Sequence, residues 1–319
     1  DDETAYNPNH LTRFTFSGVT ALARGTREAL QEHGVAWAIS DILPYTQQTD
    51  FFHTSNEVSF HPDCPNAEAD NIGGVISFCS MDAHFSLFTA LGVDVVELSG
   101  NHNNDYGFDA YRRTLEMFRE NDIATVGGGE TLQAARQPFV VTHHQNTVAL
   151  IACNWAGPDI ALVNENAGRP GAAYCDMAWL NEVIPELALT YDVVIVSVQY
   201  QEVEQHTPTE RQRLDFRTLA SLGADAVIGT QAHKPQTFEF FTDNAHQAFI
   251  HYGLGNLFFD QEFWGNRRFF MDTLYIYQGR LLTVDLFTGI IEEQARPRPM
   301  TPEEQVTFLQ FMFIQQNGF

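Results

Sequence analysis

The sequence predicts an α/β protein with one large domain. Apolar runs of strand type alternate with helical patterns along most of the 319 residues, which is typical of β-α-β units and of a sheet with parallel strands. Several of these runs are followed directly by polar residues. No repeat, low-complexity linker or sharp change in composition divides the chain, and a chain of this length can bury a large core.

Strands and helices alternate in the first half of the chain. We expect strands at 13–16, 50–54, 93–98 and 123–126, and helices at 26–33, 85–91 and 108–121. Gly92 directly follows the second helical pattern and is expected to end that helix. The glycine triplet at 127–129 lacks the spacing of a phosphate-binding or dinucleotide-binding loop. It predicts either a turn or a close approach of the backbone to a ligand.

The second half continues with buried strands and ends in a helix. We expect strands at 148–153, 193–198 and 226–228, and strand-type residues recur at 249–257 and 274–287. Two segments, 207–210 and 301–304, fit a capping box with proline at the first helical position. They predict a helix that ends at Gly223 and a closing helix at 302–315.

Charge and hydropathy exclude several classes of partner. The chain has 17 basic and 41 acidic side chains, a net charge of −24, and Lys234 is its only lysine. Nucleic acid and anionic lipid surfaces are therefore not expected as partners, because both require clustered basic residues. The acidity indicates either a highly soluble surface or one that attracts cations. No apolar run is long enough to span a bilayer. The first residues carry no export-signal pattern, so such a signal was removed or was never present.

Four cysteines predict the redox environment. They include no C-x-x-C pair, so a structural zinc site is not indicated. We expect nearest-neighbour disulfides, Cys64–Cys79 and Cys153–Cys175, each closing a loop; the alternative is four buried reduced thiols. If the disulfides form, the protein resides in an oxidising, extracytoplasmic compartment.

The strongest local signal for chemistry is the tripeptide Gly100-Asn101-His102, which follows the strand expected at 93–98. Glycine permits a tight turn, and an amide oxygen beside an imidazole can ligate a cation or orient a phosphate-like group. The carboxyl ends of strands in open α/β sheets are where ligands bind.

His233 is the second signal, because it too follows a predicted strand, at 226–228. Its imidazole is a candidate metal ligand or general acid. His251 and Asp260 follow in strand-like segments. Each histidine alone is more often structural, but several at one sheet edge indicate a site.

Five segments resemble, in order, the motifs of the bacterial capsule-synthesis CapA (poly-γ-glutamate biosynthesis, PGA_cap) family. They are 14–25 (F-x-GDVML-x-RG), 55–57 (NLE), 97–107 (ANNH-x-x-DYG), 220–236 (AGADxVIGxHPHxxQ) and 251–261 (YSLGNFxFDQ). Gly100-Asn101-His102 also matches the GNH box of calcineurin-like metallophosphatases.

The resemblance implies a metallophosphatase-like sandwich of two mixed β-sheets flanked by helices, in one domain at 12–290. Residues 1–11 are then an N-terminal extension, and 291–319 a C-terminal tail whose closing helix packs on the same domain. The implied role is in making, attaching or trimming an anionic cell-surface polymer, poly-γ-glutamate or capsule, outside the cytoplasm. The implied partner is that polymer or its precursor.

The resemblance also implies a metal site, formed by Glu57, Asn101, His102 and His233. The cofactor would be a divalent ion, Mn, Zn, Fe or Mg, or none. His102 and His233 are the expected catalytic residues, with a metal-bound water as a possible nucleophile.

Three positions depart from the family pattern. Val19 stands where the opening aspartate is expected, Gln199 replaces the histidine of an HWG motif, and Thr230-Gln231 replace the first part of a His-Pro-His block. Valine has no lone pair and glutamine is a weak ligand, so a two-metal clamp is poorly supported. We expect Gln199, Gln231 and Asn256 to contact substrate instead.

Two functions follow from these residues. One is a metal-dependent hydrolase or transferase that acts on a phosphoester or on an amide of a surface polymer. The other is a catalytically degenerate binding or assembly protein on the same scaffold, for which Val19 is the best support.

Overall fold

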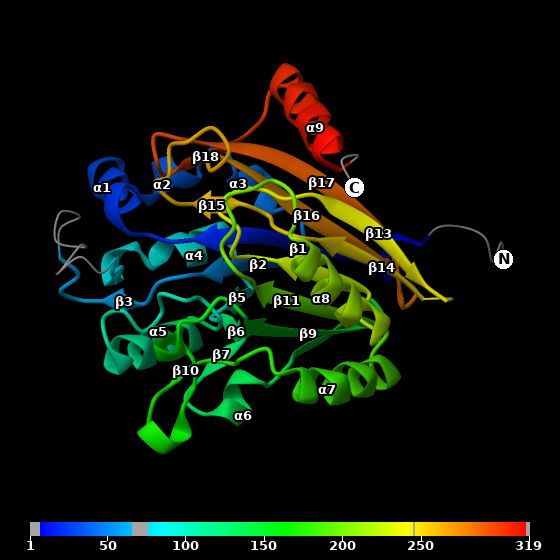
Figure 1. The fold of residues 1–319 in the computed structure, drawn as a ribbon. Helices are drawn as coiled ribbons and strands as arrows, with labels where there is room; N and C mark the ends of the chain where they lie inside the picture. The colour runs from blue at the N-terminus through cyan, green and yellow to red at the C-terminus, as the bar shows by residue number, and fades with distance from the viewer. Residues whose placement is uncertain (1–6, 66–75, 245, 317–319) are drawn as a thin grey trace.

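The computed structural model describes residues 7–65, 76–244 and 246–316, and two large β-sheets form its centre (Figure 1). The first sheet has the order β18-β17-β16-β1-β2-β5-β6, with β15 also paired to β1. Its strands are β1 (Leu11–Thr20), β2 (Phe51–Asn56), β5 (Val95–Glu97), β6 (Ala124–Val126), β15 (Asn256–Phe258), β16 (Arg268–Tyr277), β17 (Arg280–Glu292) and β18 (Arg296–Pro299). β1, β2, β5, β6 and β15 run parallel, whereas β16, β17 and β18 are joined antiparallel.

The second sheet has the order β13-β14-β12-β11-β9-β8. Its strands are β8 (Phe139–His143), β9 (Asn146–Asn154), β11 (Val193–Gln199), β12 (Ala226–Gly229), β13 (Phe238–Asp243) and β14 (His246–His251). The four central strands are parallel and the two edge strands antiparallel. The predicted fold class, a sandwich of two mixed sheets flanked by helices, is confirmed.

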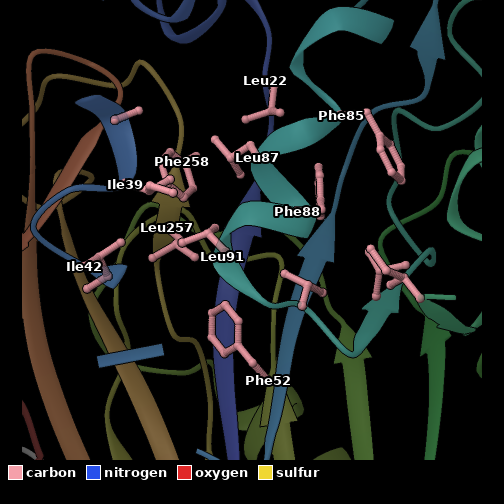
Figure 2. Packing of buried hydrophobic residues seen from close by; sticks show 14 of the residues in the cluster. Leu22, Ile39, Ile42, Phe52, Phe85, Leu87, Phe88, Leu91, Leu257 and Phe258 are labelled. Carbon is pink, nitrogen blue, oxygen red and sulfur yellow. The ribbon is translucent and has the colours of Figure 1, made fainter. Parts of the chain in front are cut away.

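Helices cover the outer faces of the sandwich. They are α1 (Arg24–His33), α2 (Val35–Ile39), α3 (Leu43–Thr46), α4 (Ser86–Leu91), α5 (Phe108–Glu120), α6 (Leu132–Ala135), α7 (Met177–Thr190), α8 (Glu210–Ser221) and α9 (Pro302–Gln316). α1, α2, α4 and α5 contribute to the apolar cluster on the first sheet, part of which Figure 2 shows around Phe52 and Phe88. α7 and α8 contribute to the cluster on the second sheet. Among the described helices, none is long and apolar enough to cross a membrane.

The central strands show why the sequence runs are continuously apolar. In β9, Val148 and Leu150 belong to the core between the sheets, whereas Ala149 and Ile151 belong to the core beneath α7 and α8. Side chains alternate between the faces of a strand. A strand that is buried on both faces therefore needs apolar residues at every position.

Three sequence expectations are corrected by the structure. The helix expected after the capping box at 207–210 begins at Glu210, because the hydroxyl of Thr209, not Thr207, accepts the capping bond from the backbone of Gln212. Residues 249–257 form parts of two strands, β14 and β15, which lie in different sheets.

The glycine triplet is the third. Gly128 and Gly129 form strand β7, which pairs with β10 (Gly171–Ala172). A side chain at Gly128 would clash with the Tyr111 hydroxyl. The backbone of the glycine triplet therefore approaches other parts of the protein closely, and not a ligand.

Both expected disulfides are present. Cys64 pairs with Cys79, and Cys153 pairs with Cys175. Cys79 directly precedes β4 (Ser80–Met81), a short strand that pairs with β3 (Phe60–His61). It also ends a segment that packs against the candidate functional site. Cys153 fixes β9 to the residues that precede α7.

Candidate functional site

The site lies where the carboxyl ends of parallel strands from both sheets meet. Glu57 follows β2 and Asn101 follows β5 in the first sheet, whereas Gln199 ends β11 and His233 follows β12 in the second. Contacts join the two sheets here, since Gln199 reaches Asn101 and His233 reaches Glu57. The strand order therefore brings four segments that are distant in sequence to one edge.

Four ionisable side chains form what we call the histidine cluster: Glu57, His102, Glu202 and His233. Nε2 of His233 lies 3.7 Å from Oε1 of Glu57 and 3.8 Å from Oε1 of Glu202. Glu57 is 1% exposed, and neither of its carboxylate oxygens has a hydrogen-bond partner among the described residues. A buried carboxylate without hydrogen bonds is costly unless a positive charge faces it.

Both imidazoles are oriented by a hydrogen bond from Nδ1. Nδ1 of His102 donates to Oδ2 of Asp105 at 2.7 Å, and Nδ1 of His233 donates to Oδ1 of Asn256 at 2.8 Å. The amide of Asn256 is fixed in turn, because its Nδ2 donates to the backbone carbonyl of Asn266. In the neutral form of each ring, Nε2 therefore carries the lone pair.

The histidine cluster favours positive charge. Burial opposes protonation of His102, but its hydrogen bond to Asp105 and the negative charges of Glu57, Asp105 and Glu202 outweigh burial and raise its pKa. Nε2 of His233 also lies near the carboxylates of Glu57 and Glu202. A hydrogen-bond donor or a metal cation between these groups would be stabilised by both negative charges.

Three neutral side chains beside it form the amide cluster: Asn101, Gln199 and Gln231. Nε2 of Gln199 donates to Oδ1 of Asn101 at 3.2 Å and also to Oε1 of Gln231. Gln199 and Gln231 are buried, and Nε2 of Gln231 has no hydrogen-bond partner among the described residues. A buried, unpaired amide N–H is suited to a ligand that brings an acceptor oxygen.

A buried carboxylate lies next to the amide cluster and is linked to it through a threonine hydroxyl. Glu97, at the end of β5, accepts hydrogen bonds from three hydroxyls, those of Ser99, Ser197 and Thr230. The Thr230 hydroxyl also lies 3.3 Å from Oε1 of Gln199, and Nε2 of His53 lies 3.5 Å from the Glu97 carboxylate. The sequence signal for this residue is a lone acid at the end of an apolar run.

An apolar wall separates the site from α1. Phe78 contacts the His102 ring with centroids 4.6 Å apart, and Phe259 contacts the His233 ring at 5.2 Å. Val19 is fully buried in the same apolar group. The position at which the family resemblance places an aspartate therefore faces hydrocarbon.

The structure places the sequence-predicted residues in different roles. Glu57, His102 and His233 come together, with Asn256 behind His233. Asn101 instead bonds to Gln199. His251 lies outside both clusters, because it is buried between the sheets with Nδ1 2.6 Å from Asp272.

Some site residues escaped the sequence reasoning. Glu202 lies in an irregular loop after β11 and has no motif. Phe78 is near the site only through contacts between distant segments, and Arg24 lies in the motif segment 14–25, to which the sequence reasoning gave no role. Within the described ranges, no group of three or more His, Cys, Asp or Glu side chains is arranged to hold a metal ion.

The fold and this site define the class of protein, an α/β sandwich with a polar site at the carboxyl ends of its parallel strands. Residues 13–261 match the family described as bacterial capsule synthesis protein PGA_cap. That match covers most of the chain, and the chain belongs to this family. The resemblance predicted from the sequence motifs is confirmed.

Two curated relatives are similar over much of their length. The capsule biosynthesis protein CapA of Bacillus anthracis is 22% identical over 304 residues, which cover 93% of this chain and 71% of that protein. The PGA biosynthesis protein CapA of Bacillus subtilis is 21% identical over 249 residues, which cover 77% of this chain and 63% of that protein. Part of each relative therefore has no counterpart in this chain.

One solved structure supports the fold. A hypothetical protein from Thermus thermophilus superposes with a TM-score of 0.50 at 15% identity. The alignment covers 87% of this chain and 98% of that protein. At this identity the likeness concerns the arrangement of the sheets and helices alone.

Proposed function

We propose that this protein acts in the biosynthesis of an anionic cell-surface polymer, poly-γ-glutamate or capsule, as a hydrolase or transferase that depends on one divalent cation. The observation that carries the proposal is the buried, unpaired carboxylate of Glu57 facing Nε2 of His233. Family membership supports the polymer pathway, and the names of the two Bacillus relatives concern capsule and PGA biosynthesis.

The donor set would suit one cation rather than two, and its members would have to close around the ion, because among the described residues they do not already surround a common point. Glu57 supplies negative charge, and Nε2 of His102 and of His233 supply nitrogen, each ring being oriented through Nδ1 as metal-ligating histidines are. Val19 and the amide cluster offer no comparable second set. When bound, the ion would supply a water of lowered pKa as nucleophile for a phosphoester or an amide.

The remaining groups would bind substrate. Nε2 of Gln231, which has no partner among the described residues, would donate to a polar group of the polymer beside Gln199, and Asn256 would keep the His233 ring in its orientation. With Nε2 on the cation and Nδ1 bonded to Asp105, His102 would act as a ligand and not as a proton donor.

We also infer the extent and the compartment of the functional unit. Residues 12–290 contain both clusters and all of the second sheet, with 1–11 as an extension, whereas the tail at 291–319 adds strand β18 to the first sheet and packs helix α9 on the core through Phe308 and Met312. The two disulfides favour an oxidising, extracytoplasmic compartment.

A second function is favoured by a specific observation. Gln199 donates hydrogen bonds to both Asn101 and Gln231, at positions where the family resemblance leads us to expect metal ligands. A protein of this kind would bind the polymer or its precursor without turnover, as an assembly factor.

Metal analysis distinguishes the two functions. Purified protein is stripped with a chelator, reloaded with Mn, Zn, Fe or Mg, and measured by mass spectrometry; we expect about one ion per chain. Glu57→Gln and His233→Ala should lose the ion and the turnover of an aryl phosphoester or a γ-glutamyl chain. Glu130→Gln, an exposed carboxylate on the surface, is the matched control and should keep both.

Two outcomes distinguish the hydrolase from the assembly factor. Wild-type protein that binds no ion after reloading contradicts the proposed hydrolase. Protein that binds the polymer in the presence of every ion but turns over neither substrate supports the assembly factor.

A further inference from the structure

We propose that Arg24, with the pocket beside it, is a subsite that binds one anionic group of the polymer, a carboxylate or a phosphate. The inference rests on the proposed function and adds to it a residue and a ligand chemistry. Arg24 lies at the start of α1 and contacts neither histidine directly in the described structure, so it is separate from the candidate metal ligands.

Arg24 is held in an unusual position. Its backbone has φ +46°, a left-handed conformation that a residue with a side chain rarely adopts. Its guanidinium carbon lies 4.8 Å from the Phe78 ring centroid and 4.9 Å from that of Phe259. Observed backbone strain of this kind is concentrated at functional sites, and the two rings fix the guanidinium in place.

The guanidinium still has hydrogen-bonding capacity. The guanidinium nitrogen Nη2 pairs with Oδ1 of Asp260, while Oδ2 of Asp260 accepts from the backbone N–H of Gly25 at 3.1 Å. Nε of Arg24 is buried and has no hydrogen-bond partner among the described residues. The side chain is about one-third exposed. An arginine with unpaired donors binds carboxylate or phosphate through its planar fork.

The two rings place this arginine next to the histidine cluster. Phe78 contacts both Arg24 and His102, and Phe259 contacts both Arg24 and His233. The two rings also contact each other, with centroids 5.9 Å apart. A single aromatic ring would therefore separate an anion bound to Arg24 from each histidine of the candidate site.

The pocket fits a short chain with an aliphatic part and one charge. It has a volume of about 520 Å³ and is lined by Arg24, Asp260, Gln261, Glu262 and Phe263. Phe263 is 78% exposed and offers an apolar wall, whereas Asp260 and Glu262 allow an anion only in direct contact with the Arg24 guanidinium. A γ-glutamyl unit has one free carboxylate and a short aliphatic segment, which matches this lining.

Calorimetric binding of two probes tests the subsite, using an oligomer of γ-glutamate and inorganic phosphate. In Arg24→Gln we expect Kd for the bound probe to rise on the order of tenfold to a hundredfold, with the cation content unchanged. Arg24→Lys keeps the charge but loses the fork, and should also bind more weakly. The control is Arg217→Gln, which removes another arginine that lies over a phenylalanine and pairs with an acid, and should bind as wild type does.

Each result has one meaning. Loss of binding in the Arg24 variants supports the subsite, and the probe that binds identifies the anion as carboxylate or phosphate. Equal affinity of wild type and Arg24→Lys, or no binding of either probe by wild type, overturns it. Arg24→Lys decides if Arg24→Gln does not fold. Since the cation content is measured separately, the subsite can fail while the proposed function stands.

Discussion

Glu97 is a buried carboxylate that accepts hydrogen bonds from both halves of the sandwich. It ends β5 in the first sheet, whereas Ser197 lies on β11 and Thr230 follows β12 in the second. Without this acceptor, the hydroxyls of Ser99 and Ser197 would lose a hydrogen-bond partner, and the buried imidazole of His53 would lose the carboxylate 3.5 Å from its Nε2. The residue therefore contributes to stability and also positions Thr230 beneath Gln199.

Glu97→Ala should lower the free energy of unfolding by about 3–5 kcal/mol, because it leaves buried polar groups unpaired. Urea unfolding at neutral pH, followed by circular dichroism, measures the loss. Glu116→Ala, an exposed acid on α5, is the control and should change stability by less than about 0.5 kcal/mol. A Glu97→Ala protein as stable as this control would show that the network is not stabilising.

At the residue scale, the sequence predicts which side chains follow the end of a strand, but it does not predict which side chains hydrogen-bond to one another. Glu57, His102 and His233 each follow a strand in the sequence, and the parallel arrangement brings them to one edge. The bond between Gln199 and Gln231, by contrast, depends on rotamers in two strands that only the fold makes neighbours.

The closing helix α9 begins as its sequence predicts, with a capping box. The hydroxyl of Thr301 accepts from the backbone of Glu304, and the carboxylate of Glu304 accepts from the backbone of Thr301 at 2.8 Å. Arg298 adds two bonds to the same carboxylate, at 2.7 and 2.9 Å. The carboxylate of Glu304 thereby joins the start of α9 to strand β18.

This acid makes the stability of the helix start depend on pH. The hydrogen bonds from Arg298 lower the pKa of Glu304 from 4.5 to about 2. A lowered folded-state pKa contributes stability above the unfolded value, and this contribution is lost as pH falls from about 4.5 to about 2. The melting temperature of wild type should exceed that of Glu304→Gln at pH 6, and the difference should shrink at pH 3.

Glu303→Gln, one residue earlier in the same turn and exposed, is the control for this measurement. Its difference from wild type should be small at both pH values. A Glu304→Gln difference that stays constant from pH 6 to pH 3 would contradict the role of the ionised carboxylate.

Element boundaries were predictable where a local signal exists. Gly92 ends α4 in the left-handed conformation, as its position after the helical pattern indicates. The passage from β14 to β15 contains Gly253 and Gly255, which indicate an interruption but not that the next strand joins the other sheet. The chain changes sheets near Gly255, where φ is +81°, and only the tertiary fold specifies that change.

At the scale of the whole molecule, the net charge of −24 bears on how an anionic polymer would be bound. Long-range repulsion opposes the approach of a polyanion to an acidic protein. The proposed contact at Arg24 is local, and aromatic rings flank it. The protein would then capture one unit of the chain rather than bind it along an extended basic surface.

This arrangement predicts an unusual salt dependence. The screening length falls from about 30 Å at 0.01 M salt to about 10 Å at 0.1 M, so added salt removes the long-range repulsion while the partly buried Arg24 contact is screened less. The association rate constant of the γ-glutamate oligomer, measured by stopped-flow fluorescence, should therefore rise over this range. An oligomer whose free α-carboxylates are amidated is the control: it carries no charge that the protein repels, so any association that it shows should change little with salt. A rate that falls with salt, as for proteins that bind polyanions through clustered basic residues, would contradict capture at a single site.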